Sequence, residues 1–440
     1  MRVAVVGAGP AGVRAVERLV AAGLRPTWVE ESPDGGGRIY QRPPPGFRRG
    51  HAALYGDDAG KARALHATLD ALKPRCDWRP DTLVWNIRRD ALETMRAGTA
   101  ATIGFDALVL CTGAMDRVVP LPGWTTPGVT TLGGAQIALK AQGVGIGRRV
   151  VFCGTGPLLL LVATQYAKAG AEVAAVLDTT PFATKLRALP GLLGNAGPFL
   201  RGLRLRAGLR VAEGITPLGI EGDAAVQGFR WRDARGRDHR VDCDAVALGW
   251  GLKPEAQLAD LAGIPFRFDA TQSNWVPETD GTGRTSIPGV YLAGDGAGIG
   301  GADVAELAGA RAALALLADA GHAVDAAALD RRLAREARFR AALERAFPWP
   351  AALAAAMADD TILCRCEAVS AGDVRALAAS EINRTKSYSR LGMGRCQGRV
   401  CGPAGAAVLA RALDCSLEEA GRLRGQMPVK PIPLPVATTP

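Results

Sequence analysis

Residues 2–12 read RVAVVGAGPAG, a short apolar stretch that runs directly into three glycines spaced as GxGxxG. The pattern predicts a buried strand, a tight turn and a helix over residues 11–22. Gly7 allows the turn, Gly9 lets the backbone approach a pyrophosphate, and Gly12 lets helix and strand pack closely. Because the N–H groups at the start of a helix favour phosphates, the stretch predicts a dinucleotide-binding unit.

A second apolar stretch, residues 26–29, ends on Glu30, which lies 18 residues past Gly12. An acid at this place accepts hydrogen bonds from the hydroxyls of an adenosine ribose. A lone glycine motif has the alternative of a purely structural turn. The order of strand, turn, helix, strand and acid is much more specific and favours a bound nucleotide.

A motif far downstream favours FAD over NAD on this first unit. Residues 285–295 read TSIPGVYLAGD, an apolar strand that ends at Gly294 and Asp295. In two-domain flavoproteins such a strand returns beside the first strand, and its Asp reaches the ribityl–pyrophosphate part of the flavin. The alternative role of Asp295 is to cap the helix that follows.

The chain partly repeats this pattern. A strand at 149–153 leads into Gly154 and Gly156, then a helix to about residue 169 and a strand ending at Asp178. These residues predict a second, inserted nucleotide-binding unit with NAD(P) or another adenine nucleotide as its candidate ligand. Leu159 replaces the third glycine, so a unit kept only for structure remains the alternative.

The predicted fold class is α/β, with two Rossmann-like domains, one inserted in the other, and a small helical four-cysteine domain. The linker shows Phe339, Leu343 and Phe347 at helical spacing; it is expected to pack on the first domain, with docking of a partner as the alternative. The expected boundaries are 1–122 with 276–329 for the FAD domain, 123–275 for the insertion, 330–360 for a helical linker, 361–415 for the four-cysteine domain, and 416–440 for a proline-rich tail.

Four of the nine cysteines are grouped as CxC and CxxxxC, and 29 residues separate the two pairs. They are Cys364, Cys366, Cys396 and Cys401. Structural zinc sites usually have two to four residues between paired cysteines, so the single residue of the first pair fits zinc poorly. Arg365, Arg395 and Arg399 stand beside the four ligands and suit an anionic [2Fe-2S] cluster. Zinc and a vestigial site are the alternatives.

Several function classes are disfavoured. The formal charge of +10 is not gathered in one block with aromatic residues, as nucleic-acid binding would require. No cysteine pair follows the first unit, where residues 36–47 read GGRIYQRPPPGF, so disulfide reduction is not expected. The N-terminus resembles a strand and not a signal peptide, and no apolar run approaches the roughly 18 residues of a membrane span. We therefore expect a cytoplasmic protein without an integral membrane span.

These motifs carry a resemblance to known proteins. CRCEAVSAGDVRAL at 364–377 and RLGMGRCQGRVCGP at 390–403 resemble the bacterioferritin-associated-ferredoxin-like [2Fe-2S] domain. With GAGPAG, GGRIYQ, LCTGAMDRVVPLPG, GTGPLLLLVA and IPGVYLAGDGAGIGGA, the chain resembles the FAD-binding α subunit of heteromeric amino-acid dehydrogenases. That family includes opine oxidases, D-hydroxyproline dehydrogenase and the hydrogen cyanide synthase flavoprotein subunit. The chain is also similar to part of the sarcosine oxidase α chain.

The resemblance implies a division of labour. A partner β subunit, similar to amino-acid oxidases and carrying its own FAD, would oxidise the C–N bond of an amino acid or opine, and the family allows a small third subunit. This chain would carry FAD and the cluster and no catalytic residue of its own. Gly37, Arg38 and Gly113 join the FAD contacts, although Arg38 stands where the family commonly has Gln. The alternative function is a self-sufficient NAD(P)H-dependent reductase of a ferredoxin-like acceptor.

Overall fold

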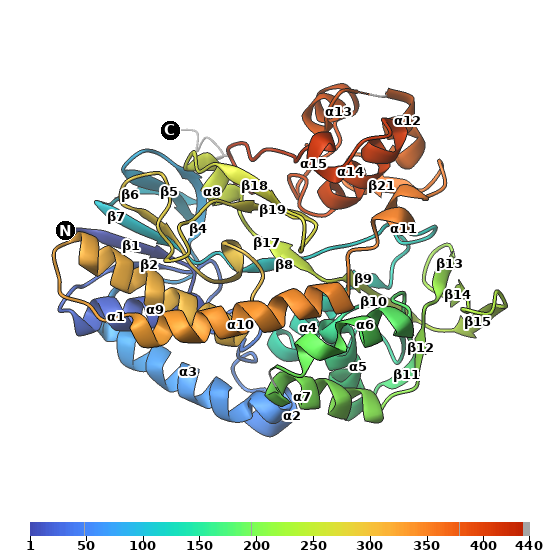
Figure 1. Ribbon diagram of the computed structural model, residues 1–440, viewed down its shortest axis with the longest axis horizontal. Coiled ribbons are helices and arrows are strands. Elements are labelled where there is room, and N and C mark those ends of the chain that lie inside the picture. Colours follow the sequence, from blue (N-terminus) through green and yellow to red (C-terminus); the bar gives the residue numbers. More distant parts are fainter. Residues whose placement is uncertain (48, 195, 378, 434–440) are drawn as a thin grey trace, which may run out of the picture.

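The computed structural model describes residues 1–47, 49–194, 196–377 and 379–433. Its frame consists of two five-stranded parallel sheets (Figure 1). The first sheet has the order β20-β7-β1-β2-β3, in which all neighbours are parallel. Its strands are β1 (Val3–Val6), β2 (Thr27–Val29), β3 (Asp77–Arg79), β7 (Ala107–Leu110) and β20 (Val290–Leu292). The predicted α/β class with Rossmann-like sheets is confirmed.

One detail of the predicted sheet was wrong. The strand that precedes Asp295 was expected beside the first strand of the chain, but β20 pairs with β7, which lies between β20 and β1. The reason is that β7 is fully buried on both sides and fills the place next to β1. The carboxyl ends of β1, β7 and β20 therefore lie in a row at one edge of the sheet.

Helices cover the first sheet because each presents an apolar face to it. In α1 (Pro10–Ala21), Val13, Val16 and Leu19 are fully buried at helical spacing. Helix α9 (Ala302–Asp319) packs so tightly on α1 that a Cβ atom at Gly309 would lie 2.0 Å from the Ala11 carbonyl oxygen. Helix α3 (Ala59–Leu72) lies beside α1, preceded by α2 (His51–Tyr55). An antiparallel meander completes this domain: β4 (Leu83–Ile87), β5 (Ala91–Arg96) and β6 (Thr99–Gly104).

The second parallel sheet forms the insertion and has the order β12-β11-β10-β16-β9. Its strands are β9 (Val129–Thr131), β10 (Arg149–Thr155), β11 (Glu172–Asp178), β12 (Val211–Glu213) and β16 (Ala245–Trp250). Its helices are α4 (Leu132–Ala141), α5 (Pro157–Lys168), α6 (Phe182–Leu192) and α7 (Ala196–Ala207). A second meander comprises β13 (Thr216–Glu221), β14 (Gly228–Arg232) and β15 (Asp238–Asp242).

The chain enters and leaves the insertion through one antiparallel pair, β8 (Ala114–Asp116) and β17 (Leu252–Pro254). After β17, helix α8 (Gln257–Leu261) returns to the first domain, where Leu258 and Ile264 share an apolar cluster with Leu108 and Leu292. The hairpin β18 (Phe266–Asp269) and β19 (Asn274–Pro277) follows. We therefore place the second boundary of the insertion near β17, about twenty residues before the one expected from sequence.

The predicted linker is largely one helix, α10 (Ala327–Ala346), which runs across both Rossmann-like domains (Figure 1). An Arg311–Asp330 ion pair of 2.6 Å joins it to α9 of the first domain. Its Phe339, Leu343 and Phe347 pack with Ala188 of α6 in the insertion. The linker thus packs on the inserted domain as well as on the first one.

The four-cysteine domain lies above the junction of the two sheets in Figure 1. It contains α11 (Ala351–Ala355), β21 (Ile362–Cys364), β22 (Val369–Ser370), α12 (Ala371–Leu377), α13 (Ile382–Ser389), α14 (Cys401–Ala412) and α15 (Leu417–Ala420). Its apolar core is continuous with that of the insertion, and the Trp124 indole donates to the Ile362 carbonyl at 2.6 Å. Two short 3-10 turns, Gly56–Asp58 and Lys73–Arg75, flank α3, and a third covers Gly294–Gly296.

The described part of the tail returns to the first domain. The Val429 amide donates to the Trp85 carbonyl at 3.1 Å, and its side chain is 1% exposed in the cluster under the first sheet. Lys430 pairs with Glu31. The tail therefore ties the four-cysteine domain to the first domain, whereas residues 434–440 lie outside the described ranges. Across the described chain, no helix combines the length and apolarity that a bilayer crossing needs.

Candidate functional site

The predicted glycine turn lies between β1 and α1, and each glycine has a packing reason. Gly7 has φ +102°, and a Cβ there would lie 2.3 Å from the Cys111 carbonyl oxygen. A Cβ at Gly12 would lie 1.9 Å from the Gly7 carbonyl oxygen. Gly9 is the N-cap of α1 and has no side-chain cap, so the helix start stays open to a ligand.

Glu30 closes the same turn from the end of β2. Its carboxylate accepts hydrogen bonds from the Ala8 amide at 2.7 Å and from the Ser32 amide at 2.9 Å. Burial raises the pKa of Glu30, while these amides and the charge of Arg38 oppose the rise. The acid is therefore held beside the glycine turn, where the ribose of an adenine nucleotide would lie.

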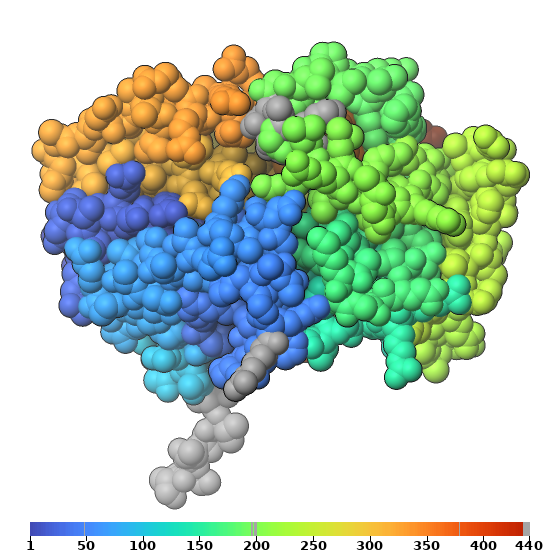
Figure 2. All heavy atoms as spheres, turned by 90° about the horizontal axis from the view of Figure 1, so that it is seen from below, coloured from blue at the N-terminus to red at the C-terminus, as the bar shows by residue number. Residues whose placement is uncertain are grey.

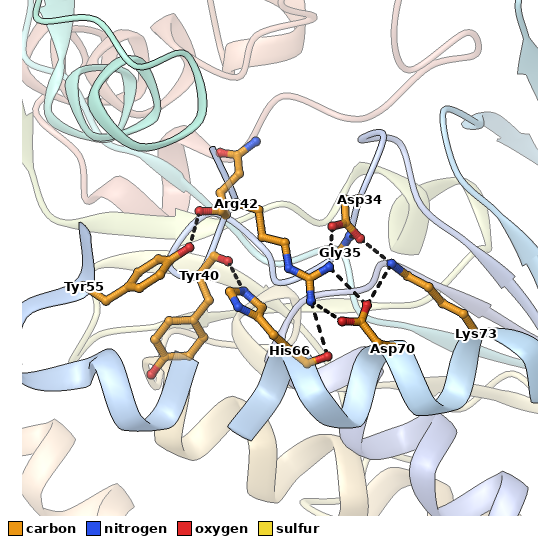
Figure 3. Close-up of polar contacts among 9 residues, drawn as sticks. Asp34, Gly35, Tyr40, Arg42, Tyr55, His66, Asp70 and Lys73 are labelled. Carbon is orange, nitrogen blue, oxygen red and sulfur yellow. Dashed lines mark hydrogen bonds and ion pairs between the residues drawn. The ribbon is translucent and has the colours of Figure 1, made fainter. Parts of the chain in front are cut away.

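A loop at 34–42 lies over the turn and is fixed by a charged network (Figure 3). Arg42 donates to Asp34 and Asp70 at 2.7 Å each, and Lys73 donates to Asp34 at 2.6 Å. The network anchors the loop on α3 and on the turn that follows it. Because the cations and carboxylates bond to each other in a closed set, the loop has little freedom to move.

The same loop carries Gly37 and Arg38. A Cβ at Gly37 would lie 3.0 Å from the Gly9 Cα, so the loop contacts the glycine turn directly. Arg38 is exposed. The Ile39 carbonyl accepts a hydrogen bond of 2.9 Å from Lys140 of α4, which joins this loop to the insertion. No sequence signal points to Lys140, because the contact spans 101 residues.

Gly113, Gly294 and Asp295 follow the neighbouring strands β7 and β20. Gly113 has φ +76° and open space around its Cα, and Gly294 has φ +70°. One Asp295 oxygen accepts from the amides of Gly300 and Gly301 at 2.8 Å each, and Gly301 is the N-cap of α9. Asp295 therefore does hold the start of the next helix. Its second carboxylate oxygen has no hydrogen bond within the described ranges and is available to a ligand.

The residues of the first domain fit FAD. They combine an uncapped helix start, a carboxylate beside it, glycines that no side chain could replace, and a second carboxylate with a free oxygen. When bound here, FAD would supply two-electron chemistry, and Gly7, Gly9, Gly12, Glu30 and Asp295 would hold its nucleotide and ribityl parts.

The second nucleotide site has a different character. Gly154 and Gly156 form a turn with positive φ before α5, and Leu159 is fully buried behind it. Asp178, however, is 3% exposed and is already bonded: Thr155 donates to it at 2.8 Å and Lys185 at 2.6 Å.

Lys185 in turn donates to Glu213 at 2.8 Å and lies 5.4 Å from the ring centroid of Phe347 in the linker. An internal cation thus occupies the place from which the Asp178 carboxylate would receive a ribose. The glycine turn is open, but the acid beside it is not free.

The structure brings the four predicted cysteines together. The Cys401 thiol hydrogen-bonds to the sulfurs of Cys364 and Cys396, and Cys396 contacts Cys366 in the same way. Cys364 and Cys366 come from the β21–β22 hairpin, and Cys401 is the first residue of α14. The expected capping box precedes α12: Ser370 and Asp373 exchange bonds of 2.8 and 3.1 Å.

Backbone amides also point at these sulfurs. Gly392 and Glu367 donate to Cys364, and Gly398 and Val400 donate to Cys396. Hydrogen bonds from the Cys401 thiol lower the pKa of Cys364 to about 6 and that of Cys396 to about 5, and the same bonds raise the pKa of Cys401. The environment therefore favours thiolates, which is the form that binds iron or zinc.

Within the described ranges, no three or more His, Cys, Asp or Glu side chains converge on a point that could hold one metal ion. The sulfurs contact each other in sequence, Cys364 to Cys401 to Cys396 to Cys366. Zinc needs four ligands around one ion, whereas a [2Fe-2S] centre spreads four cysteines over two irons. The donor set and its amide hydrogen bonds fit a [2Fe-2S] centre, which when bound would transfer single electrons.

One connection between the two sites was not predicted. Glu255 follows β17; its amide donates to the Gly113 carbonyl at 2.9 Å, and its carbonyl accepts from the Thr112 hydroxyl. Its carboxylate receives both guanidinium arms of Arg399, at 2.7 and 2.8 Å, between side chains that are 14% and 7% exposed. Arg399 lies between Cys396 and Cys401 in the sequence.

Arg399 was expected to offer its charge to the cysteines, and that expectation was wrong because Glu255 neutralises it. Arg365 also has another partner, since its guanidinium lies 5.5 Å from the ring centroid of Trp124. No sequence signal reveals the Glu255–Arg399 pair, because its members are 144 residues apart and belong to different domains.

Comparison with known proteins agrees with this geometry. A pyridine nucleotide-disulphide oxidoreductase family matches residues 1–315. The chain belongs to that family. It is therefore an oxidoreductase with the flavoprotein fold of two nucleotide-binding domains, as the two sheets indicate.

Similar proteins cover nearly the whole chain. A subunit of opine oxidase from Rhizobium meliloti is 35% identical over 98% of this chain and 86% of its own length. Hydrogen cyanide synthase subunit HcnB from Pseudomonas protegens is 30% identical over 98% of this chain and 96% of its own. These relatives confirm the family recognised from the motifs.

A solved structure, L-proline dehydrogenase from P. horikoshii, has the same fold. It matches with a TM-score of 0.70 at 20% identity, over 98% of this chain and 78% of that one. The common architecture therefore includes the C-terminal third of the chain as well as the two Rossmann-like domains.

Proposed function

We propose that the chain is the electron-transfer α subunit of a hetero-oligomeric dehydrogenase, holding FAD in its first domain and a [2Fe-2S] cluster on its four cysteines. A partner β subunit, similar to amino-acid oxidases and with its own FAD, oxidises the C–N bond of an amino acid or opine. The relatives support this assignment, since both are named as subunits of a larger enzyme.

The observation that carries the proposal is the contact through Glu255. Its backbone bonds to Thr112 and Gly113 at the FAD site, and its carboxylate bonds to Arg399 between two of the cysteines. A buried, two-pronged ion pair fixes the distance between the two sites. Such a contact suits electron transfer between a flavin and a cluster, because that transfer needs close and constant spacing.

In this assignment the residues of the chain bind and position, and they carry out no proton chemistry on the substrate. Gly9, Glu30 and Asp295 hold the nucleotide and ribityl parts of FAD. The amides of Gly392 and Gly398 stabilise charge on the cysteine sulfurs. Electrons enter from the partner's flavin and leave through the cluster, which passes them on singly.

A second function, an NAD(P)H-dependent reductase of a ferredoxin-like acceptor, rests on the open Gly154–Gly156 turn. The bonding of Asp178 argues against it. An entering nucleotide would have to displace Lys185 from two carboxylates, Asp178 and Glu213, or bind without a ribose acceptor. We therefore place the source of electrons in the partner subunit and not in NAD(P)H.

The two functions differ in a simple experiment. The oxidised holoprotein is mixed without oxygen with NADH or NADPH, and flavin absorbance is followed in a stopped-flow instrument. The electron-transfer subunit leaves the flavin oxidised on the turnover timescale with both nucleotides, while dithionite reduces it as the positive control. Rapid bleaching by either nucleotide would overturn the assignment in favour of the reductase.

A further inference from the structure

An apolar and basic surface lies on the two helices that separate β11 from β12. Of the large apolar side chains exposed on the described chain, five belong to this short segment and are 47–58% exposed. They are Phe182, Leu186, Leu193, Leu200 and Leu203, and together we call them the α6–α7 face. Figure 2 shows the green segment that contains both helices at the surface.

Helical spacing explains why these side chains point outward together. In and just after α6, residues 182, 186 and 193 are spaced by four and seven, which places them on one side of the helix. The opposite side buries Ala188 and Leu192 against α10. In α7, Leu200 and Leu203 are three residues apart and also face outward. Each helix thus has one side that packs on the protein and another, apolar side that does not.

The charge of the segment is of one sign. Residues 179–212 contain no Asp or Glu. They contain Lys185, Arg187, Arg201, Arg204, Arg206 and Arg210. Lys185, Arg201 and Arg206 pair with acids elsewhere in the molecule. Arg187, Arg204 and Arg210 are exposed and form no ion pair within the described residues.

We infer that the α6–α7 face binds the surface of a bilayer that contains anionic phospholipid. Large apolar side chains beside arginines, with no acid between them, are the composition of helices that lie in the plane of a membrane interface. Free arginines complement the negative charge of phospholipid headgroups. A protein interface of the usual kind has both signs of charge around an apolar centre, and this segment has one.

The contact is superficial. No helix of the described chain is long and apolar enough to span a bilayer, so the leucines enter only the headgroup region. This surface is independent of the cofactor sites, since none of its described residues contacts the glycine turn of the first domain or the four cysteines. It would place a flavoprotein of this family beside electron acceptors dissolved in a membrane.

Vesicle flotation tests the inference with the purified holoprotein. Wild-type protein is mixed with vesicles of phosphatidylcholine alone or of phosphatidylcholine with phosphatidylglycerol. It should float with the mixed vesicles and not with the neutral ones. The variants Leu200→Glu with Leu203→Glu, and Arg187→Glu with Arg204→Glu, should each bind roughly ten-fold more weakly or worse. Flavin content should stay unchanged, because the altered side chains are exposed.

Matched controls change the same chemistry elsewhere. Val324→Glu with Tyr388→Glu alters exposed apolar residues outside the face, and Arg89→Glu with Arg96→Glu reverses two exposed arginines on the first meander. Both controls should float as the wild type does. Three results would each overturn the inference: no flotation of the wild type with anionic vesicles, equal binding to neutral ones, or face variants that still float but lose the partner subunit.

Discussion

At the scale of single residues, the FAD site depends on close backbone contacts that only glycine permits. The contact of Gly12 with the Gly7 carbonyl is the tightest in the turn, since an added Cβ would approach that oxygen to 1.9 Å. No side-chain movement relieves this clash, because both groups are backbone. The turn would have to open, and with it the site for the pyrophosphate.

We therefore expect Gly12→Ala to lose most of its flavin and to unfold at lower temperature. Gly60→Ala is the matched control, because Gly60 lies in α3 with nothing within 4 Å of its added Cβ. It should keep its flavin and gain about 0.5–1 kcal/mol of stability from helix propensity. Flavin-to-protein absorbance ratios and thermal unfolding measure both. Full flavin content in Gly12→Ala would show that the turn does not hold the cofactor.

The Glu255–Arg399 pair gives a second prediction at this scale. Removing either partner leaves a buried charge, so Glu255→Gln or Arg399→Met should cost about 3–5 kcal/mol of the free energy of unfolding. The double variant should cost much less than the sum of the two. Denaturant unfolding of all four proteins measures the coupling, and additive losses would show that the two side chains act independently.

The same pair predicts a pH dependence. Burial alone would raise the pKa of Glu255, but the hydrogen bonds and charge of Arg399 outweigh it and hold the pKa below its ordinary value of 4.5. The stabilisation is therefore present above that value and is lost as pH falls through the lower value in the folded protein. Wild type should lose stability relative to Glu255→Gln as pH falls below about 4.5; a constant difference would contradict this.

At the scale of elements, two loops at the start of α14 and in the β21–β22 hairpin gather the cysteines. Cys396→Ser should abolish bound iron and acid-labile sulfide while flavin stays. Cys415→Ser is the control, because Cys415 lies outside the group of four contacting thiols and should keep both. Metal analysis of anaerobically purified protein measures this. Stoichiometric zinc without iron in the wild type would exclude the proposed cluster.

The tail is the other element with a measurable role. Val429 is 1% exposed, and its carbonyl accepts a hydrogen bond from Arg399. Val429→Ala should cost about 2 kcal/mol from lost apolar burial and loosen the four-cysteine domain. Met427→Ala, at a side chain that is 65% exposed, should cost little. Limited proteolysis between residues 346 and 362 should be faster in Val429→Ala only, and equal rates would exclude a docking role for the tail.

At the scale of the whole molecule, sequence patterns predicted whatever local geometry determines. The glycine turns, Glu30, the strand ends at Gly113 and Asp295, and the four cysteines all follow from short motifs with a backbone reason. Sequence could not show that β7 separates β20 from β1, that α10 packs on both domains, or that Lys185 occupies Asp178. Those features depend on contacts between distant segments, and none has a local signature.

The domain arrangement also explains why the role of Arg399 could not be predicted. From sequence it stands beside two cysteines, and its charge would be assigned to them. In the folded chain the four-cysteine domain packs on the first domain through this residue, so its partner is Glu255 and the amides of the cysteine loops remain to stabilise the sulfurs. The relative placement of the domains, and not the motif, determines the role of Arg399.

The most direct test of the central claim is stopped-flow spectroscopy of the complex purified with its partner subunit and given its amino-acid or opine substrate without oxygen. We predict that flavin absorbance falls first and that the cluster absorbance follows, at a rate no slower than turnover. In Glu255→Gln, flavin reduction should persist while the cluster step slows. A cluster that stays oxidised throughout turnover in the wild type would contradict the proposed electron path and leave the four-cysteine domain with a structural role.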